Sequence, residues 1–276
     1  PIGMCESLYK DGLRDHASWA ARMVGPALAD YGQFAVGIRS GGEAAAAALQ
    51  VQVSASNTTV VGSTDCSNAF CLADPDLTAE SLLEMRAIMR ASSKSDRAEV
   101  CLALEWCLDE LCFIRHNGGL VYSVVDGVLE SFSITIGEVQ GGLASMTRFC
   151  VFAAMRVLKP IRDRFPEVTP ISIADDATFA MYVPDQAALR RFAEAMRYYG
   201  ELMDACGQKT NWDKFVILQH PSAIEFPQCD IAEHLDLFPA DAATCERPRV
   251  TRGAIKFNGV GVGFQPAARA EITMEA

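Results

Sequence analysis

Two adjacent acids, Asp175 and Asp176, stand between short apolar runs at residues 169–174 and 177–183. Apolar runs on either side of a polar break are typical of a β-hairpin, so we predict a hairpin with both acids at its tip. Successive strand residues face opposite sides of a sheet, so both carboxylates could point to the same site only from a tight turn. Carboxylates at a sheet edge must be solvated, paired or bound to a cation.

A third acid, Asp65, ends a β-branched run at residues 58–64 that is typical of a buried strand. Carboxylate oxygens are the ligands that Mg2+ prefers. Phosphoryl transfer at two metal ions, about 3.5–4 Å apart, requires several such ligands. The three acids are therefore candidate ligands of a metal pair, although tandem acids on a turn also fit a simple solvated turn.

The rest of the chain alternates helical and strand patterns. Helices are predicted over 4–23, 43–52, 78–92, 96–115, 141–158 (ending before Pro160) and 185–206. Single strands are predicted over 33–38, 215–219 and 254–264, and a hairpin over 121–125 and 128–135 around Asp126-Gly127. This order predicts an α+β fold in which helices back one face of an antiparallel sheet.

Composition fits a folded domain or two close subdomains, since 50% of the 276 residues are hydrophobic and 21% are charged. No apolar run reaches the about 20 residues of a membrane-spanning helix, so we expect no membrane contact. The chain opens on Pro1 rather than Met, and we expect it to be a fragment. The net charge of −11 counts against nucleic-acid binding, unless a local basic patch or a further domain supplies the phosphate contacts.

The ten cysteines contain no Cys-x-x-Cys pair, and the four histidines do not lie beside them at zinc spacing. Several cysteines lie inside apolar runs, where a free thiol packs as a small hydrophobe. We therefore expect reduced, buried thiols in a reducing intracellular compartment, nuclear or cytoplasmic. A metal site or disulfides are the alternative.

Several short motifs together resemble a reverse transcriptase, nearest to those of non-LTR retrotransposons. The chain carries them in the family's order: Pro1-Ile2-Gly3, Gln33 to Gly37 with Gly41-Gly42-Glu43, Ser63 to Phe70, Val139 to Gly142, Ile173 to Asp176, Gly207 to Lys214 and Lys256 to Gly259. The third contains Asp-x-x-Asn-Ala-Phe, the fifth ends in Ala-Asp-Asp, and the sixth reads Gly-x-x-x-Asn-x-x-Lys. The resemblance covers residues 1 to about 265 and implies a polymerase palm with part of the fingers.

The resemblance implies roles for the acids. Asp65 and Asp175 would bind two Mg2+ ions, with Mn2+ as a possible substitute. Asp176 would support the site, and the carbonyl oxygen of Cys66 would be a further ligand.

The resemblance also implies a nucleotide-binding set. Phe70 would be a steric gate that excludes a 2′-hydroxyl, although its pattern alone fits a core residue. Gln140 and Gly141 would lie against the template and incoming nucleotide, or form a plain loop before a helix. Lys214 would sit near the triphosphate, or be an exposed lysine at a strand start. Arg39 would touch nucleotide phosphates from the fingers.

The implied domains are partial fingers over 1–60 and a palm over 61–265, with a finger/palm insertion within 71–135. Residues 266–276 would begin a truncated connection to a thumb, so thumb or accessory domains are expected in the full-length chain. The implied activity is RNA-directed DNA polymerisation, with an RNA template, a DNA or RNA primer and dNTPs as partners.

The chain departs from the family pattern at three places. Ile173 replaces an aromatic residue, and Asn258 replaces Leu. After Gln140-Gly141, the chain continues with Gly142, Leu143 and Ala144 instead of the family's usual residues. Three alternatives stay open. One is a catalytically degenerate palm that acts as a binding module, and another is a viral RNA-dependent RNA polymerase palm. The third, a nucleotide-binding α/β enzyme, rests only on the alternating Gly259, Gly261 and Gly263; no helix is predicted after them, which counts against a dinucleotide-binding loop.

Overall fold

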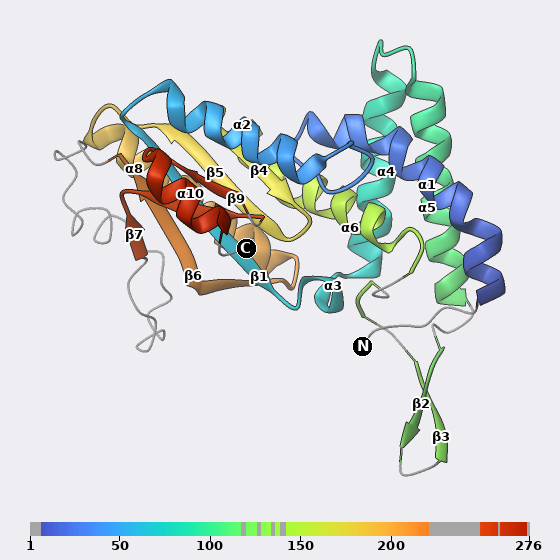
Figure 1. Ribbon diagram of the computed structural model, residues 1–276. Coiled ribbons are helices and arrows are strands. Elements are labelled where there is room, and N and C mark those ends of the chain that lie inside the picture. Colours follow the sequence, from blue (N-terminus) through green and yellow to red (C-terminus); the bar gives the residue numbers. More distant parts are fainter. Residues whose placement is uncertain are drawn as a thin grey trace.

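The computed structural model describes residues 7–116, 120–125, 128–133, 136–138, 142–220, 249–258 and 260–274. Its centre is a five-stranded sheet in the order β4-β5-β1-β6-β7 (Figure 1). The strands are β4 (Val168–Ile173), β5 (Asp176–Tyr182), β1 (Thr59–Ser67), β6 (Lys209–Gln219) and β7 (Arg249–Thr251). All neighbours are antiparallel except β7, which pairs with β6 in parallel.

One face of the sheet packs against a helical layer. This layer contains α6 (Ser145–Ala153), the π-helical turn η1 (Ala154–Leu158), α7 (Lys159–Arg164) and α8 (Gln186–Ala205). Its core includes Phe179 and Phe215 from the strands and Phe192 from α8. A Cβ atom at Gly62 of β1 would lie 3.1 Å from the Phe192 ring and 3.2 Å from the Phe215 ring, so glycine lets these rings approach the strand.

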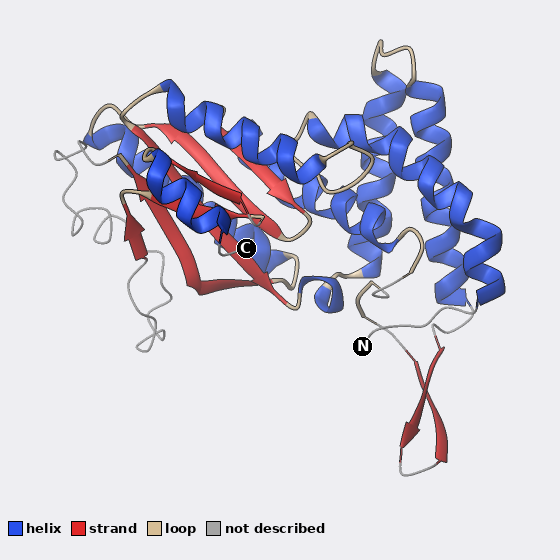
Figure 2. Cartoon of the chain, in the orientation of Figure 1, coloured by secondary structure: helices blue, strands red, loops and turns tan. Residues whose placement is uncertain are grey.

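The opposite face is also covered, as Figure 2 shows. Helix α2 (Gly41–Ala55) lies across it, together with the hairpin of β8 (Ala254–Phe257) and β9 (Val260–Gly263) and helix α10 (Pro266–Met274). Ala45 and Leu49 of α2 and Ile255 of β8 are buried there against Val61 and Leu218 of the sheet. The predicted α+β sheet backed by helices is therefore confirmed, and the alanine-rich α2 adds a helix on the second face as well.

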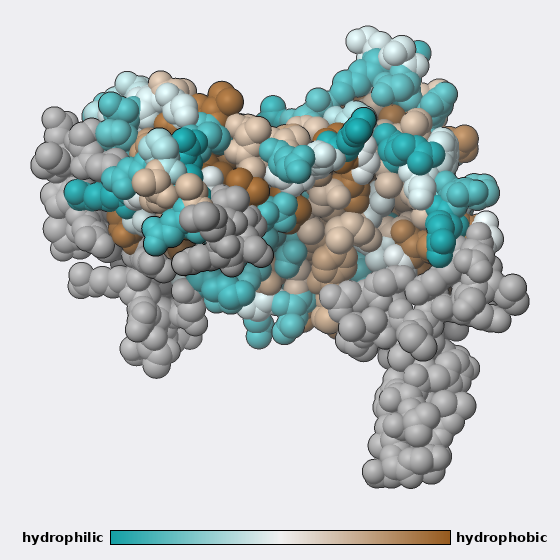
Figure 3. Space-filling view, viewed as in Figure 1, coloured by the Kyte–Doolittle hydropathy of each residue, from teal (hydrophilic) through white to brown (hydrophobic). Residues whose placement is uncertain are grey.

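A second core lies within a group of helices beside the sheet. Helices α1 (Ser7–Ala29), α4 (Pro75–Ala91) and α5 (Arg97–His116) pack there with α6. Helix α4 begins after Asp74, whose carboxylate accepts from the amides of Asp76 and Leu77 at 2.7 and 3.3 Å. On the face in Figure 3, hydrophobic residues gather towards the middle, and hydrophilic ones cover both ends.

The short helix α3 (Ala69–Leu72) follows β1, and strands β2 (Leu120–Val125) and β3 (Val128–Ser133) form a separate hairpin. That hairpin confirms the expected pairing, whereas its turn residues Asp126 and Gly127 lie outside the described residues.

Apart from differences in bounds, three predicted elements differ from the structure. Residues 33–38 form no strand; they contribute one bridge from Gln33 to Ser172. Residues 254–264 form the β8–β9 hairpin rather than one strand. The helix expected to end before Pro160 continues through it, because the π-helical turn at 154–158 places Pro160 in the first turn of α7, where no amide donor is needed.

Within the described part of the chain, seven cysteines are free thiols and five of them are buried. Burial raises the pKa of the Cys66 thiol to about 12, so it is protonated at neutral pH. No described helix is both long and apolar enough to cross a membrane.

Candidate active site

Asp65 and Asp176 lie on neighbouring strands at one end of the sheet. Ser63 of β1 pairs with Thr178 of β5, and their hydroxyl oxygens lie 3.0 Å apart on one face. The next pair is Thr64 and Ala177, which face the other side. Alternation along both strands therefore returns Asp65 and Asp176 to the face of Ser63 and Thr178.

The two carboxylates line one cavity of about 490 Å3. Strand β6 contributes Lys214 and Val216, and the β7–β8 region contributes Thr251, Lys256 and Asn258. The acids are only partly exposed, and the wall facing them is mixed in polarity. The cavity is therefore a polar recess between the central sheet and the β8–β9 hairpin.

A bulge in β6 brings Lys214 to this recess. Val216 pairs with Ser63 and Asn211 with Asp65, so residues 212–215 of β6 lie opposite Thr64 alone. Bulges of this kind redirect a side chain. The Lys214 ammonium donates to Asp65 Oδ2 at 2.5 Å, and this contact raises the pKa of Lys214.

Both acids are predicted at the hairpin tip; Asp175 lies there, whereas Asp176 is already the first residue of β5 and pairs with Ile173. The turn between Ile173 and Asp176 consists of Ala174, at a left-handed φ of 53°, and Asp175. Asp175 lines a separate small cavity with Cys66, Tyr199 and Gln208. The adjacent acids thus lie against different cavities.

The three acids nevertheless influence one another. Burial, followed by the charges of Asp175 and Asp65, raises the pKa of Asp176 to about 6. Burial and the charge of Asp65 also raise the pKa of Asp175. Like charges that disfavour each other's ionisation leave such a cluster ready to accept a cation.

Gln33 fixes the hairpin tip, and sequence patterns missed it. Its side chain is fully buried, its Nε2 donates to the Ala174 carbonyl at 3.0 Å, and its Oε1 accepts from the Ala174 amide at 2.9 Å. Nε2 also lies 3.2 Å from the Ser172 hydroxyl. A lone glutamine before an apolar run carries no local signal for this contact, which spans 141 residues.

The donor chemistry fits Mg2+, which usually binds one or two protein carboxylates and keeps other positions for water and substrate phosphates. Asp65 and Asp176 in one recess supply such a pair. Among the described residues, no group of three or more histidine, cysteine, aspartate or glutamate side chains is gathered closely enough to hold an ion. The Cys66 thiol is directed to Gln208 Oε1 at 3.3 Å, so only its carbonyl oxygen suits the ligand role expected for that residue.

The other predicted nucleotide-binding residues do not gather in the recess. The Phe70 ring stacks on Phe149 with centroids 4.4 Å apart and is not among the residues that line the cavity of Asp65. Arg39 is exposed in the loop between α1 and α2. Gln140 and Gly141 lie outside the described residues.

A buried ion cluster anchors the segment that leads to Gln140. Arg148 of α6 is fully buried and donates from Nε to Glu138 Oε1 at 2.9 Å, and it also contacts Glu110 of α5. The Glu138 amide donates to the Phe70 carbonyl at 2.7 Å. The segment before the Gln-Gly motif is therefore tied to α3, α5 and α6.

Comparison with known proteins shows the fold. No protein-family model matches the chain, and no curated protein matches its sequence. Telomerase from Candida albicans, solved with a fragment of telomeric RNA, is similar over 95% of the chain and 41% of its own length, at 12% identity and a TM-score of 0.57. Apo telomerase from Candida tropicalis is similar over 92% and 39%, at 10% identity and a TM-score of 0.55.

A C-terminally truncated apo telomerase from Candida tropicalis covers 75% of the chain and 40% of its own length, with 12% identity and a TM-score of 0.50. The chain thus spans about two fifths of the length of these telomerases. It has a reverse-transcriptase-like fold, with the palm-like sheet that the sequence predicted.

Proposed function

We propose that this chain is the palm and partial fingers of an RNA-directed DNA polymerase. The observation that carries the proposal is the recess in which Asp65 and Asp176 lie on neighbouring strands with Lys214 beside them, in a reverse-transcriptase-like fold. The motif order supports the non-LTR retrotransposon branch, whereas the solved neighbours are telomerases. The proposal therefore names the reaction rather than the host element.

The three acids and the Cys66 carbonyl are the proposed metal ligands. The family resemblance makes Asp65 and Asp175 the main pair with Asp176 in support, whereas the recess itself is lined by Asp65 and Asp176. When bound, two Mg2+ or Mn2+ ions would neutralise charge on the attacking and leaving oxygens of the primer 3′-hydroxyl and the dNTP. The protein's own contribution is positioning, because both strands and the Gln33-bound turn fix the carboxylates before substrate arrives.

Lys214 is the proposed contact for the triphosphate. Its ammonium lies at the recess on Asp65, and a phosphate there would compete for the same donor. Lys256 lines the same cavity and adds a second positive charge to it. The negative net charge of the chain counts against phosphate binding, but local charge decides it, and these two lysines supply local positive charge.

Phe70, Gln140, Gly141 and Arg39 remain proposed contacts for the sugar, template and nucleotide. The Phe70 ring stacks on Phe149, so it would have to contact the sugar while it keeps that stacking. The proposed partners are an RNA template, a DNA or RNA primer and dNTPs. The RNA bound to the Candida albicans telomerase supports a nucleic-acid partner.

Primer extension tests the proposal. The protein is given a primed RNA template, Mg2+ or Mn2+ and dNTPs, beside Asp65→Asn and Asp175→Asn as inactive variants and Asp204→Asn on α8 as a matched control. We expect extension by the wild type and by Asp204→Asn, and none by the first two. Extension with ribonucleotides instead of dNTPs would favour the RNA polymerase alternative.

A degenerate palm that only binds is the second candidate. It is favoured by the absence of a three-ligand cluster among the described residues and by the lysine on Asp65. Folded protein that extends no primer with either metal, yet binds RNA, would select this candidate.

A further inference from the structure

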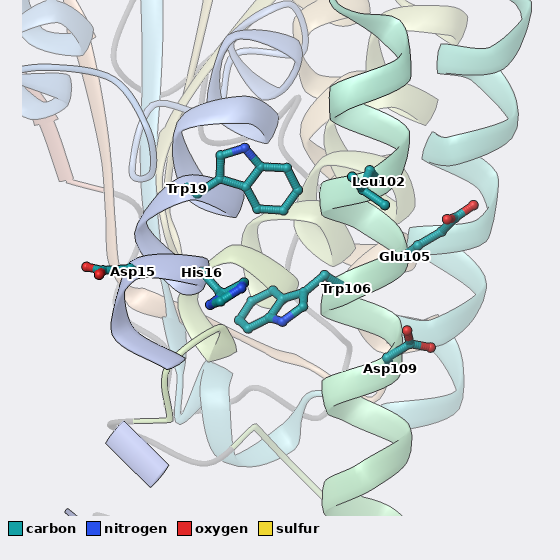
Figure 4. Close-up of a pocket in the computed structure, with 7 residues that line it drawn as sticks. All are labelled: Asp15, His16, Trp19, Leu102, Glu105, Trp106 and Asp109. Atoms are coloured by element: carbon teal, nitrogen blue, oxygen red, sulfur yellow. The ribbon is translucent and has the colours of Figure 1, made fainter. Parts of the chain in front are cut away.

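A groove between α1 and α5 lies outside the proposed active site. It has a volume of about 570 Å3 and is lined by Asp15, His16, Trp19, Leu102, Glu105, Trp106 and Asp109. In Figure 4, the rings of His16, Trp19 and Trp106 lie in the space between the two helices. His16 stacks on Trp106 with centroids 6.3 Å apart and an interplanar angle of 22°.

The groove presents apolar surface to solvent. Trp19 and Trp106 are half-buried, because their inner parts pack on the helical core. Leu102, one helical turn before Trp106, is 56% exposed. A cluster of exposed apolar and aromatic side chains with a polar border is typical of a binding surface.

The charged border is acidic. Glu105 already pairs with Arg86 at 3.1 Å and Arg90 at 2.9 Å. Asp15 and Asp109 are exposed and form no ion pair with any described residue. Figure 4 shows them on opposite sides of the rings, Asp15 from α1 and Asp109 from α5. Among the described residues that line the groove, none is a lysine or an arginine, and its acidic border favours a cation over a phosphate.

The groove is elongated rather than closed. A neighbouring cavity of about 340 Å3 shares Trp106 and Asp109 and continues to Leu13. A single small cation would leave most of this surface uncovered. A peptide segment with both cationic and apolar side chains would cover it.

We propose that the α1–α5 groove binds an arginine-bearing segment of a partner protein. A guanidinium group stacks well on indole rings, and within the described chain no cation of its own lies over Trp19 or Trp106. Asp15 and Asp109, on the two borders of the groove, would attract its positive charge, and Leu102 would contact a neighbouring apolar side chain. Arginine is favoured over lysine because its planar guanidinium group can stack on an aromatic ring and also pair with carboxylates.

Fluorescence anisotropy tests this proposal with a labelled peptide of alternating arginine and leucine. The paired variant Asp15→Asn with Asp109→Asn removes the two border charges without changing a core residue, and Trp106→Leu removes a ring. The control, Glu201→Gln with Asp204→Asn on α8, removes the same charge from exposed positions elsewhere. We expect binding about tenfold weaker for both groove variants and unchanged for the control.

A second peptide, with citrulline in place of arginine, should bind the wild type about tenfold more weakly, because citrulline keeps the shape and loses the charge. Equal affinity of the groove variants and the control would overturn the proposal, as would equal affinity for the citrulline peptide. An RNA oligonucleotide that binds the groove, or a dimer in sedimentation that the paired variant abolishes, would assign the groove to another occupant. No nucleotide addition is measured, so the result is independent of the polymerase proposal.

Discussion

At Asp176, the ionised carboxylate that a metal site requires lowers the stability of the metal-free fold. Its folded pKa, raised to about 6 by burial and by its two acidic neighbours, lies above that of an unfolded aspartate at about 3.9. The folded state therefore binds the proton more tightly. The contribution of this carboxyl group to the free energy of unfolding is therefore complete below the unfolded pKa, and it is lost as the pH rises through about 6.

Replacing Asp176 with Asn should therefore stabilise the metal-free protein at neutral pH. We expect a gain of about 1 kcal/mol, reduced by the partial exposure of the group, and almost none near pH 4. Thermal unfolding with chelator at both pH values measures it, with Asp204→Asn as the control. A loss of stability at neutral pH would show that the Asp176 carboxylate is compensated in the fold.

Gln33 should act as a positioning residue for the hairpin tip. Gln33→Met keeps the volume and removes the hydrogen bonds to Ala174, which leaves a buried amide unpaired at a cost of roughly 2–3 kcal/mol. Gln50→Met is the matched control, because Gln50 likewise bonds both the amide and the carbonyl of one residue, Gly263.

Only Gln33→Met should also weaken Mn2+ binding and lower kcat for primer extension. Titration of both variants with Mn2+, under conditions in which both are folded, separates a positioning role from a purely structural one. Equal Mn2+ affinity of the two variants would assign Gln33 to stability alone.

At the scale of elements, the Arg148 cluster joins α5, α6 and the segment at Glu138. Arg148→Met would leave Glu110 and Glu138 buried without their cation, and we expect a loss of about 3–5 kcal/mol. Arg156→Met is the control, because its partner Glu80 is 62% exposed and such pairs contribute about 1 kcal/mol or less. Urea unfolding measures both, and similar losses for the two variants would contradict a buried structural role for Arg148.

Elements whose signal is local could be predicted from the sequence. The β4–β5 hairpin, α2, α4, α5 and α8 follow from apolar periodicity and lie within a few residues of their expected bounds. The strand expected at 33–38 failed because Gln33 uses its side chain on the hairpin tip and forms only one bridge. The β6 bulge that brings Lys214 to Asp65 depends on strand pairing, which no local pattern reveals.

At the scale of the whole molecule, a net charge of −11 means that the proposed phosphate contacts depend on local basic residues. Lys256 is exposed at the recess, where it could contact one phosphate. Lys256→Gln should therefore lower the magnitude of the slope of the logarithm of the primer–template binding constant against the logarithm of the salt concentration by about one. Lys94→Gln, between α4 and α5, should leave it unchanged. Fluorescence anisotropy over a salt series measures the slopes, and equal slopes for the two variants would place the nucleic acid elsewhere.

The overall fold was more predictable than the arrangement of the site. Motif order indicated a palm, and the similarity to telomerases confirms a reverse-transcriptase-like fold. The sequence grouped Asp65, Asp175 and Asp176 as one site, but it could not show that Asp175 lines a different cavity from the other two. That divergence depends on the backbone of the turn at Ala174.

The most direct test of the central claim, that these acids form a divalent-metal centre, is a Mn2+ titration followed by electron paramagnetic resonance with a dNTP present. We predict saturable binding by the wild type and by Asp204→Asn, and loss of that binding in the paired variant Asp65→Asn with Asp176→Asn. Equal binding of Mn2+ by the wild type and the paired variant would contradict the account.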